Sequence, residues 1–369
     1  MNMNSPPIQP DELARKLAHI KEHVTSWLRK RCVVGKPFGV FQLCANAFSQ
    51  DGELNASTGA LELWVMLGLP LSDNERKSAI QVLKAYQNRD SGLVTDPSWK
   101  SRQLGADSRE ADRGDTFFTM TSSSALKALG SRFDYPIRYL SEMTPEALIN
   151  KTRITTGAHN PFAIGDFGEL VRLNVQLGVT DASRQWERLM SYLVDIQDTQ
   201  TGLWPRGQTY PPYVPHINRS FHLMRTTWNG ISYPYARADR MIDTCLSAAD
   251  DPQFYDWTHG YACNDLDLAV MLYSASRWTT YRTEDVSAWA RHRLPLVLEV
   301  QKDDGGFSFF HDAAMRDHAG IAMSPGHSES DTWGTLMYMG TIKMMVELGY
   351  DTVSVPWTYS QVHCVPRRP

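Results

Sequence analysis

The chain carries Ile196-Gln197-Asp198-Thr199-Gln200-Thr201-Gly202-Leu203-Trp204 near its middle, and two similar stretches lie at residues 86–93 and 300–307. In each of the three, a Gln follows an apolar, helix-like segment and a Gly stands five positions after the Gln. Such internal repeats indicate an architecture built from similar structural units. A shorter segment, Gln50-Asp51-Gly52, is a candidate for a fourth copy.

Apolar periodicity and helix-ending residues divide the rest of the chain into about twelve helices. Several segments end in Leu-Gly, as at Leu67-Gly68, where glycine suits the left-handed position after a helix. Strand patterns are nearly absent, so we predict an all-α fold. The helices are expected to begin near Asp11, Ser57, Asp73, Asp115, Tyr135, Asp166, Asp181, Asn218, Ala236, Asp265, Thr283 and Asp331.

Every second helix in this order is richer in apolar or small residues, for example over residues 268–272, and the helices between them carry more charge. A helix that is apolar on all sides lies inside a protein, whereas a helix with one apolar stripe lies outside. The pattern predicts a single (α/α)6 toroid of about twelve helices, six inner and six outer. We expect the toroid over residues 11–350, a disordered tail over residues 1–10 and a C-terminal extension over residues 351–369.

The Gln-to-Gly segments resemble the QW repeats of the squalene cyclase and prenyltransferase superfamily, the terpenoid cyclase/prenyltransferase toroids. In such a repeat the Gln amide is expected to cap the end of its outer helix while the aromatic side chain packs beneath the turn. The resemblance implies an α/α toroid and isoprenoid chemistry. Related toroids also serve polysaccharide lyases, glycoside hydrolases and non-enzymatic thioester domains, so the fold alone does not select the reaction.

Composition excludes several function classes. The 369 residues carry a net charge of −4 without a basic block, which argues against nucleic-acid binding. The five cysteines are scattered and form no Cys-x-x-Cys pair, which is typical of a reducing compartment. We find neither a signal peptide nor an apolar run of about 18 residues. The sequence therefore predicts a cytoplasmic protein without stable membrane insertion.

Four of the predicted inner helices open with an aspartate: Asp115, Asp166, Asp265 and Asp331. If the inner helices of the toroid run in parallel, these carboxylates face the same mouth. Each one is also a favourable N-cap, because its side chain accepts backbone N–H bonds and complements the helix dipole. The four aspartates are therefore either catalytic acids and bases or helix caps.

A second acid follows in Asn264-Asp265-Leu266-Asp267, and this stretch resembles the Asp-x-Asp-Asp motif of class II terpene cyclases. Alignment on the Ala-Val that follows puts Asn264 on the first Asp of the motif, Leu266 on its protonating Asp and Asp267 on its last. Leu266 cannot donate a proton, so the resemblance implies that a donor in a shifted register, Asp265 or Asp267, takes that role. Such a donor must stay neutral in an aromatic pocket that tolerates cations. The aromatic candidates are Phe117, Tyr261 and Trp333.

Two loops carry further candidates. A Pro-rich loop leads to His216, Asn218 and Arg219, which suit a carboxylate, uronate or phosphate on a substrate. The loop over residues 320–331 is a candidate lid. Its His327 could act with Asp331 as an acid/base pair or could contact the substrate. Both loops are equally compatible with solvated surface segments.

No metal or other cofactor is expected. Protein prenyltransferase β-subunits, which belong to the superfamily named above, hold zinc through Asp-x-Cys and a later His. Here the order is Cys263-Asn264-Asp265, so a zinc site at Cys263, Asp265 and His327 is only an alternative. A complete Asp-Asp-x-x-Asp motif, a P-loop and a Rossmann fingerprint are missing from the sequence.

These observations favour a metal-independent acid/base enzyme, most of all a terpenoid-type, class II-like cyclase acting as an isomerase or lyase on a small, lipid-like molecule. The first alternative is an intracellular glycoside hydrolase or lyase acting on uronic-acid-containing oligosaccharides. It would use Asp115 or Asp166 with Asp265 or Asp331 as general acid and base. The second alternative is a non-catalytic binding scaffold in which the aspartates only cap helices.

Overall fold

We analysed a computed structural model of the chain. It describes residues 7–102, 108–157, 163–204, 213–224, 236–256, 262–318 and 320–359. These residues form helices connected by turns and loops, with one small antiparallel hairpin of β1 (Asp317–His318) and β2 (Ile321–Ala322). The predicted all-α fold class is confirmed.

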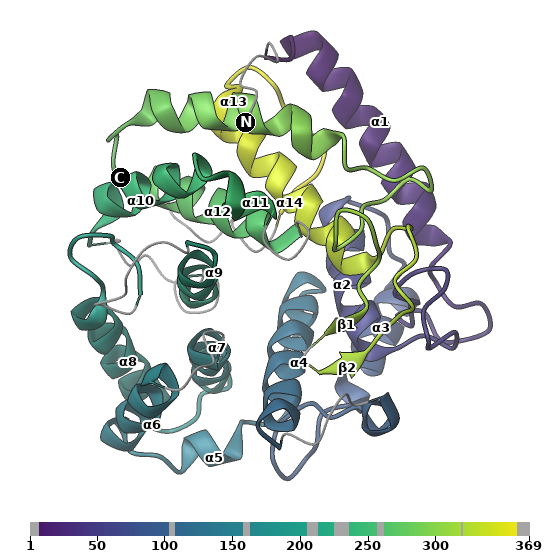
Figure 1. The fold of residues 1–369 in the computed structure, drawn as a ribbon. Helices are drawn as coiled ribbons and strands as arrows, with labels where there is room; N and C mark the ends of the chain where they lie inside the picture. Colours follow the sequence, from purple (N-terminus) through teal and green to yellow (C-terminus); the bar gives the residue numbers. More distant parts are fainter. Residues whose placement is uncertain are drawn as a thin grey trace.

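Six helices form a closed inner ring, in which each helix packs against the next and the last returns to the first. Figure 1 shows this ring surrounding the centre of the molecule. In chain order the inner helices are α2 (Leu54–Met66), α4 (Ser108–Ala128), α7 (Ala163–Gln176), α9 (Val214–Leu223), α12 (Ala262–Ala275) and α14 (Thr332–Gly349).

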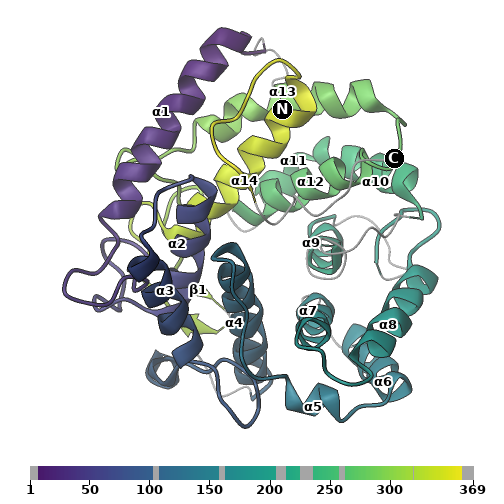
Figure 2. The ribbon, with the colours of Figure 1, turned by 180° about the vertical axis from the view of Figure 1, so that it is seen from behind.

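A second set of helices lies on the perimeter, which Figure 2 shows from behind. Outer and inner helices alternate along the chain, as the sequence predicts. The outer helices are α1 (Pro10–Arg29), α3 (Asp73–Ala85), α6 (Pro145–Gly157), α8 (Ala182–Ile196), α10 (Ala238–Ala249) and α13 (Thr283–Leu298). The short elements η1 (Pro97–Arg102), α5 (Arg138–Ser141) and α11 (Pro252–Asp256) lie in the connections.

Burial explains the two layers. In α14 every residue from Thr332 to Ile342 is buried, so this part of the helix presents no polar face to water. In α1 the buried residues are confined to one stripe that includes Leu13, Leu17 and Val24. Continuous burial is typical of a helix in the interior and a single stripe is typical of a helix on the surface. Among the described residues, none of the helices is both long and apolar enough to cross a bilayer.

The starts of neighbouring inner helices lie at the same edge of the ring. Trp333, the second residue of α14, donates its indole N–H to the backbone oxygen (3.1 Å) and to Oδ1 (2.9 Å) of Asn55, the second residue of α2. Cys263, the second residue of α12, lies 3.8 Å from Met337 of α14 through the two sulfur atoms. We call this edge, where α2, α12 and α14 begin, the rim.

The three Gln-to-Gly segments have similar structures, although the third bonds to the residue before its repeat glycine, Gly306. The side-chain amide of Gln87 donates to the carbonyl of Gly92 (2.9 Å), that of Gln197 to Gly202 (2.8 Å) and that of Gln301 to Gly305 (2.9 Å). The amide therefore bonds within the turn that follows the outer helix, and not to the helix end as we expected.

Glycine is required at these turns because neighbouring backbone approaches closely. Gly92 has φ +78°, and a Cβ atom there would lie 1.9 Å from the carbonyl oxygen of Pro136. Gly202 has φ +71°, and its Cβ would lie 2.6 Å from the nitrogen of Met241. The turn thus brings the next segment into contact, at a distance that only glycine permits.

After each turn, a backbone N–H donates to a hydroxyl group on the next inner helix. These bonds join Val94 to Thr119 of α4, Trp204 to Ser220 of α9 and Phe307 to Thr335 of α14. A fourth joins Phe41 to Ser57 of α2. The predicted fourth repeat at residues 50–52 is wrong in detail, since the Gln50 amide donates to Ala45 and Ala47 and not to Gly52.

Several helices begin earlier than predicted. Asp115 lies well inside α4, which begins at Ser108, and Asp166 is the fourth residue of α7. Asp265 is likewise the fourth residue of α12. Only Asp331 is the N-cap residue of its helix. The expectation that all four aspartates open their helices is therefore wrong for three of them.

Candidate functional site

Asp331 is completely buried, and backbone groups surround its carboxylate. Oδ1 accepts the N–H of Gly334 (2.7 Å), and Oδ2 accepts those of Phe309 (2.7 Å) and Met315 (3.0 Å). Burial raises the pKa of Asp331 to about 6, and the backbone N–H groups oppose that shift. These contacts are those of a helix cap that also anchors the preceding loop, and they agree with the interpretation of Asp331 as an N-cap.

Asp265 is held by a guanidinium group. Arg293 of α13 donates to Oδ1 through Nε (2.7 Å) and to Oδ2 through Nη2 (3.1 Å), and the guanidinium carbon lies 3.7 Å from the centre of the Tyr255 ring. His311 Nε2 lies 4.0 Å from Oδ2. Both oxygens of Asp265 are therefore engaged by one guanidinium group, the arrangement of a bidentate ion pair between α12 and α13.

Asp265 and Asp267 point in different directions. Both are buried in α12, but residues two positions apart point about 200° from one another around a helix. Asp267 thus faces neighbours other than Arg293. Asp115 is partly buried in α4, while the side chain of Asp166 lies outside the described residues.

The predicted aromatic residues gather around a histidine. The ring of His318 on β1 packs beside Phe117 of α4 and Trp333 of α14, with ring centres 4.5 and 5.5 Å away, and Phe117 and Trp333 are 6.2 Å apart, so the three rings form a triangle. Both aromatic side chains are buried. Tyr261, the third predicted member, lies outside the described residues. We call Phe117, Trp333 and His318 the aromatic cluster.

The other predicted binding residues are dispersed. His216 is buried and Arg219 is partly buried, both in α9. His327 is exposed, and its backbone oxygen accepts N–H groups from Ala314 and Glu329. The structure therefore does not place the His327 side chain as a buried acid/base partner of Asp331.

The predicted lid is tied down along its length. Glu329 accepts the backbone N–H of Ala45 (2.9 Å) and the side-chain amide of Asn46 (3.1 Å). Ser324 Oγ donates to the carbonyl of Met315 (2.8 Å). In the part of the chain that the structure describes, no three His, Cys, Asp or Glu side chains gather as a metal site, including Cys263, Asp265 and His327.

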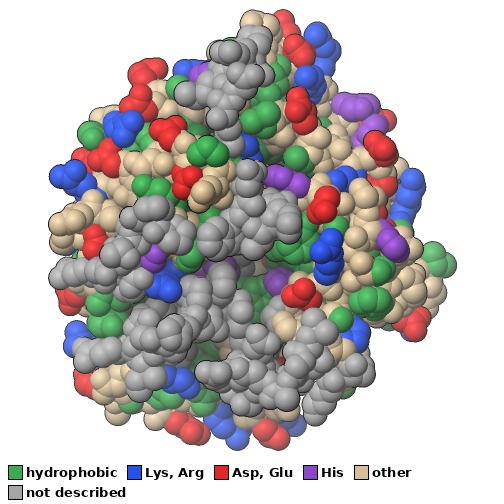
Figure 3. All heavy atoms as spheres, viewed as in Figure 1, with side chains coloured by type: hydrophobic (Ala, Val, Ile, Leu, Met, Phe, Trp, Pro, Cys, Tyr) green, Lys and Arg blue, Asp and Glu red, His purple; other side chains and the backbone are tan. Residues whose placement is uncertain are grey.

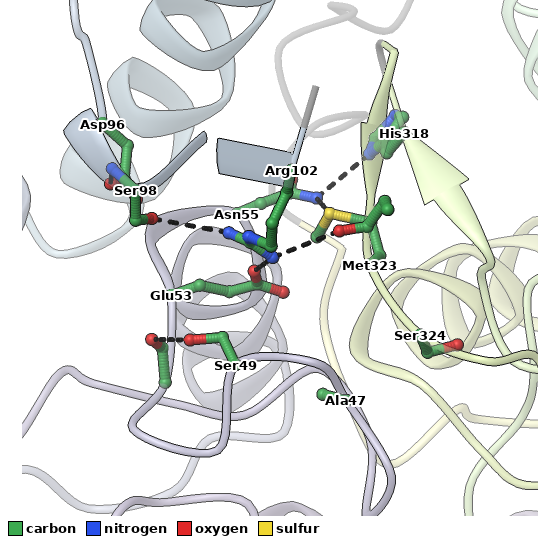
Figure 4. A network of polar contacts seen from close by, with 12 residues as sticks. Ala47, Ser49, Glu53, Asn55, Asp96, Ser98, Arg102, His318, Met323 and Ser324 are labelled. Atoms are coloured by element: carbon green, nitrogen blue, oxygen red, sulfur yellow. Dashed lines mark hydrogen bonds and ion pairs between the residues drawn. The ribbon is translucent and has the colours of Figure 1, made fainter. Parts of the chain in front are cut away.

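Four polar residues at the rim were not predicted from sequence, and Figure 4 shows them together: Glu53, Asn55, Arg102 and His318. Glu53 precedes α2, and its side chain is fully buried. Arg102 Nη1 donates to Glu53 Oε2 (2.5 Å). Glu53 Oε1 is also buried and accepts no hydrogen bond from any described residue. Burial raises the pKa of Glu53 to about 7, Arg102 opposes this shift and Asp96 adds to it.

Arg102 connects Glu53 to the hairpin. Its Nη1 also lies 3.3 Å from the carbonyl oxygen of Ala322 on β2, and its Nη2 lies 3.5 Å from Ser98 Oγ (Figure 4). The guanidinium therefore joins the start of α2, the η1 turn and the hairpin that carries His318. A single cationic group thus fixes the position of three rim elements.

A chain of hydrogen bonds determines which ring nitrogen of a neutral His318 carries the proton. The Trp333 indole can only donate, so the oxygen of the Asn55 amide must face it (2.9 Å). The Asn55 amide nitrogen then faces His318 Nδ1 (3.2 Å) and donates to it. A neutral His318 consequently carries its proton on Nε2.

One sequence signal would have located Glu53. A carboxylate stands four residues before the hydroxyl group that accepts the turn N–H in three inner helices, at Glu53/Ser57, Asp115/Thr119 and Asp331/Thr335. In the first two, the hydroxyl donates to the backbone oxygen of the acidic residue, at 2.7 and 2.6 Å. Glu53 thus occupies the position in α2 that Asp115 occupies in α4 and Asp331 in α14.

Comparison with known proteins gives structural neighbours only. No family model matches the chain, and no curated protein matches it in sequence. The apo structure of the type II terpene cyclase MstE from Scytonema has 14% identity and a TM-score of 0.46, covering 90% of this chain and 98% of that one. An MstE variant in complex with its substrate, geranylgeranyl dihydroxybenzoate, has 14% identity and a TM-score of 0.47, covering 91% and 99%. A likeness at this identity concerns the fold alone.

Proposed function

We propose that the chain is an acid/base enzyme that cyclises a small isoprenoid molecule at the rim of the toroid, as class II-like terpenoid cyclases do. The observation that carries the proposal is the joint occurrence of an aromatic cluster and buried carboxylates at the rim. Aromatic faces stabilise cations, and a carboxyl group kept partly protonated by burial can transfer a proton. Proton-initiated cyclisation requires both.

Each predicted residue except His327 has a role in this proposal. Asp115 and Asp267 are the candidate proton donors in the described part of the chain, and Asp166 is a third candidate from the sequence. Asp265 and Asp331 support the wall of the site through Arg293 and the backbone. Phe117, Trp333 and, from the sequence, Tyr261 stabilise the cation. His216 and Arg219 hold a polar group of the substrate.

The experiment offers the protein linear polyprenyl compounds in heavy water, namely geranylgeranyl diphosphate, 2,3-oxidosqualene and geranylgeranyl dihydroxybenzoate. Cyclisation started by an enzyme acid puts deuterium into the product, which mass spectrometry detects. Unsaturated uronosyl oligosaccharides form the parallel arm. Release of sugar without any cyclised lipid would replace the proposed function by a carbohydrate-active one.

Variants then assign the donor. Asp115→Asn or Asp267→Asn should lower the rate of cyclisation about 100-fold or more, since general acids contribute that much. The matched control is Asp134→Asn, which removes a largely exposed carboxylate paired with Lys84. Activity in EDTA tests the expected independence from metal, and stoichiometric zinc in the purified active protein would contradict it.

A further inference from the structure

Glu53 differs from four of the other buried carboxylates. In Asp265, Asp331, Glu169 and Glu329, both carboxylate oxygens accept hydrogen bonds. Glu53 Oε2 is bonded to Arg102, whereas Glu53 Oε1 is buried and accepts no hydrogen bond from the described residues. Buried acceptors without a donor are rare in folded proteins and call for an explanation.

The position of Glu53 suggests what this oxygen does. Glu53 immediately precedes α2, and Asn55, two residues later, contacts both Trp333 and His318 of the aromatic cluster. Arg102 joins the Glu53 carboxylate to the hairpin that carries His318. The Glu53 carboxylate is therefore joined, through Oε2 and Arg102, to the hairpin that carries one ring of the aromatic cluster.

We propose that Glu53 is the proton acceptor of the rim and that Oε1 is the accepting atom, an inference that rests on the proposed acid/base function. In a cyclisation, the final cation has a C–H bond next to the positive carbon. The electrons of that bond form the C=C bond of the product, and the proton moves to Oε1. The substrate gains one proton from the donor and loses one to Glu53, so the reaction is an isomerisation without a co-reactant.

The charges around Glu53 suit this role. Arg102 from η1 and Asp96, just before η1, are the charged groups that act on it. Arg102 keeps its contact with Oε2 whichever form Oε1 takes. Burial raises the pKa of Glu53 to about 7, so the ionised carboxylate is a stronger base than an ordinary one and is still populated at neutral pH.

The test compares Glu53→Gln with Glu169→Gln, which removes the charge of another buried glutamate paired with an arginine, Arg172. With a polyprenyl substrate, Glu53→Gln should still consume it, because initiation uses a different acid. The yield of cyclic olefin should fall about 100-fold relative to the control. A cyclic alcohol, formed when water adds to the final cation, should replace it. Glu53→Asp should restore part of the olefin. A purely structural role would lower consumption and leave the product ratio unchanged.

A spectroscopic measurement keeps the two proposals separate. Infrared spectra of the wild-type protein from about pH 5 to about pH 9 should show a protonated carboxyl band that disappears near neutral pH and is missing in Glu53→Gln. If no substrate is turned over but this band titrates, the proposed function fails, while the titrating carboxyl group at Glu53 stands. An unchanged olefin yield in Glu53→Gln, or no such band, overturns the assignment of Glu53.

Discussion

The pair formed by Asp265 and Arg293 and the pair formed by Glu53 and Arg102 contain the same two chemical groups in different surroundings. Arg293 engages both oxygens of Asp265 and stacks on the Tyr255 ring. Arg102 engages one oxygen of Glu53 and uses its other contacts on Ser98 and the hairpin. The first pair joins two long helices, whereas the second joins the start of an inner helix to a short turn.

If Glu53 accepts a proton as proposed, the count of hydrogen bonds, and not the identity of the residues, separates a structural pair from a reactive one. A buried carboxylate with both oxygens engaged is satisfied as an anion. A buried carboxylate with one open oxygen gains by binding a proton or a donor from outside. The net charge of −4 and the mixed charges on the described surface in Figure 3 distinguish neither pair.

The largest expected effect tests the satisfied pair. Arg293→Met leaves the Asp265 carboxylate buried without a counter-charge, which should lower the free energy of unfolding by about 3–5 kcal/mol. Urea unfolding followed by circular dichroism measures this loss. Adding Asp265→Leu should recover part of it, because an apolar pair replaces the ion pair. A loss of unfolding free energy under about 1 kcal/mol would mean that this ion pair contributes no more than a solvent-exposed one.

The pH dependence of stability tests the open pair. Burial raises the pKa of Glu53 from 4.5 to about 7. Below the lower value Glu53 is protonated in both the folded and unfolded states, and its stabilising contribution is complete. As pH rises through about 7, that contribution is lost, up to about 3 kcal/mol. Chemical unfolding at several pH values should show this fall in the wild-type protein.

Glu53→Gln isolates the effect, because other buried groups such as Asp331 titrate in both proteins. The difference in unfolding free energy between Glu53→Gln and the wild type should grow in favour of the variant as pH rises from about 4.5 to about 7. Parallel stability curves over that range would mean that Glu53 keeps its ordinary pKa, and the contrast between the two pairs would disappear.

The fold was predictable because the distribution of apolar and polar residues in each helix indicates how far that helix is buried. Inner helices such as α14 lack a polar face, and outer helices such as α1 keep one, so the alternation gave six inner and six outer helices. The first residue of each helix was harder to predict. The stretch before Asp115 contains Glu110 and Ala111, which favour helix, so α4 begins at Ser108 and Asp115 is not its cap.

The candidate site was predictable only in part. Phe117 and Trp333 lie near one another because both belong to inner helices, while their role in stabilising a cation stays a prediction. Glu53 and Arg102 lie 49 positions apart, and their pairing depends on a tertiary contact that no local pattern encodes. Asp265 lies within the motif-like stretch, but its partner Arg293 belongs to another helix, so their contact could not be predicted from that stretch.

A smaller effect is expected at the fully satisfied cap. Asp331→Asn replaces one accepting oxygen by an N–H₂ group that faces backbone donors, which should cost about 1–3 kcal/mol of unfolding free energy. Cyclisation measured at a temperature where the variant is folded should stay near the wild-type rate. A rate loss of about 100-fold in folded protein would instead make Asp331 a catalytic acid.

The smallest effect concerns the ring beneath Arg293, which has no counterpart at Arg102 in the described contacts. Tyr255→Phe keeps the ring face and removes only the hydroxyl that accepts the Trp289 N–H (3.2 Å), so it should cost about 1 kcal/mol. Tyr255→Leu also removes the cation–π contact and should cost about 1–2 kcal/mol more. Equal losses in the two variants would show that the stacked guanidinium gains nothing from the ring, and that the two arginines differ only in how many carboxylate oxygens they reach.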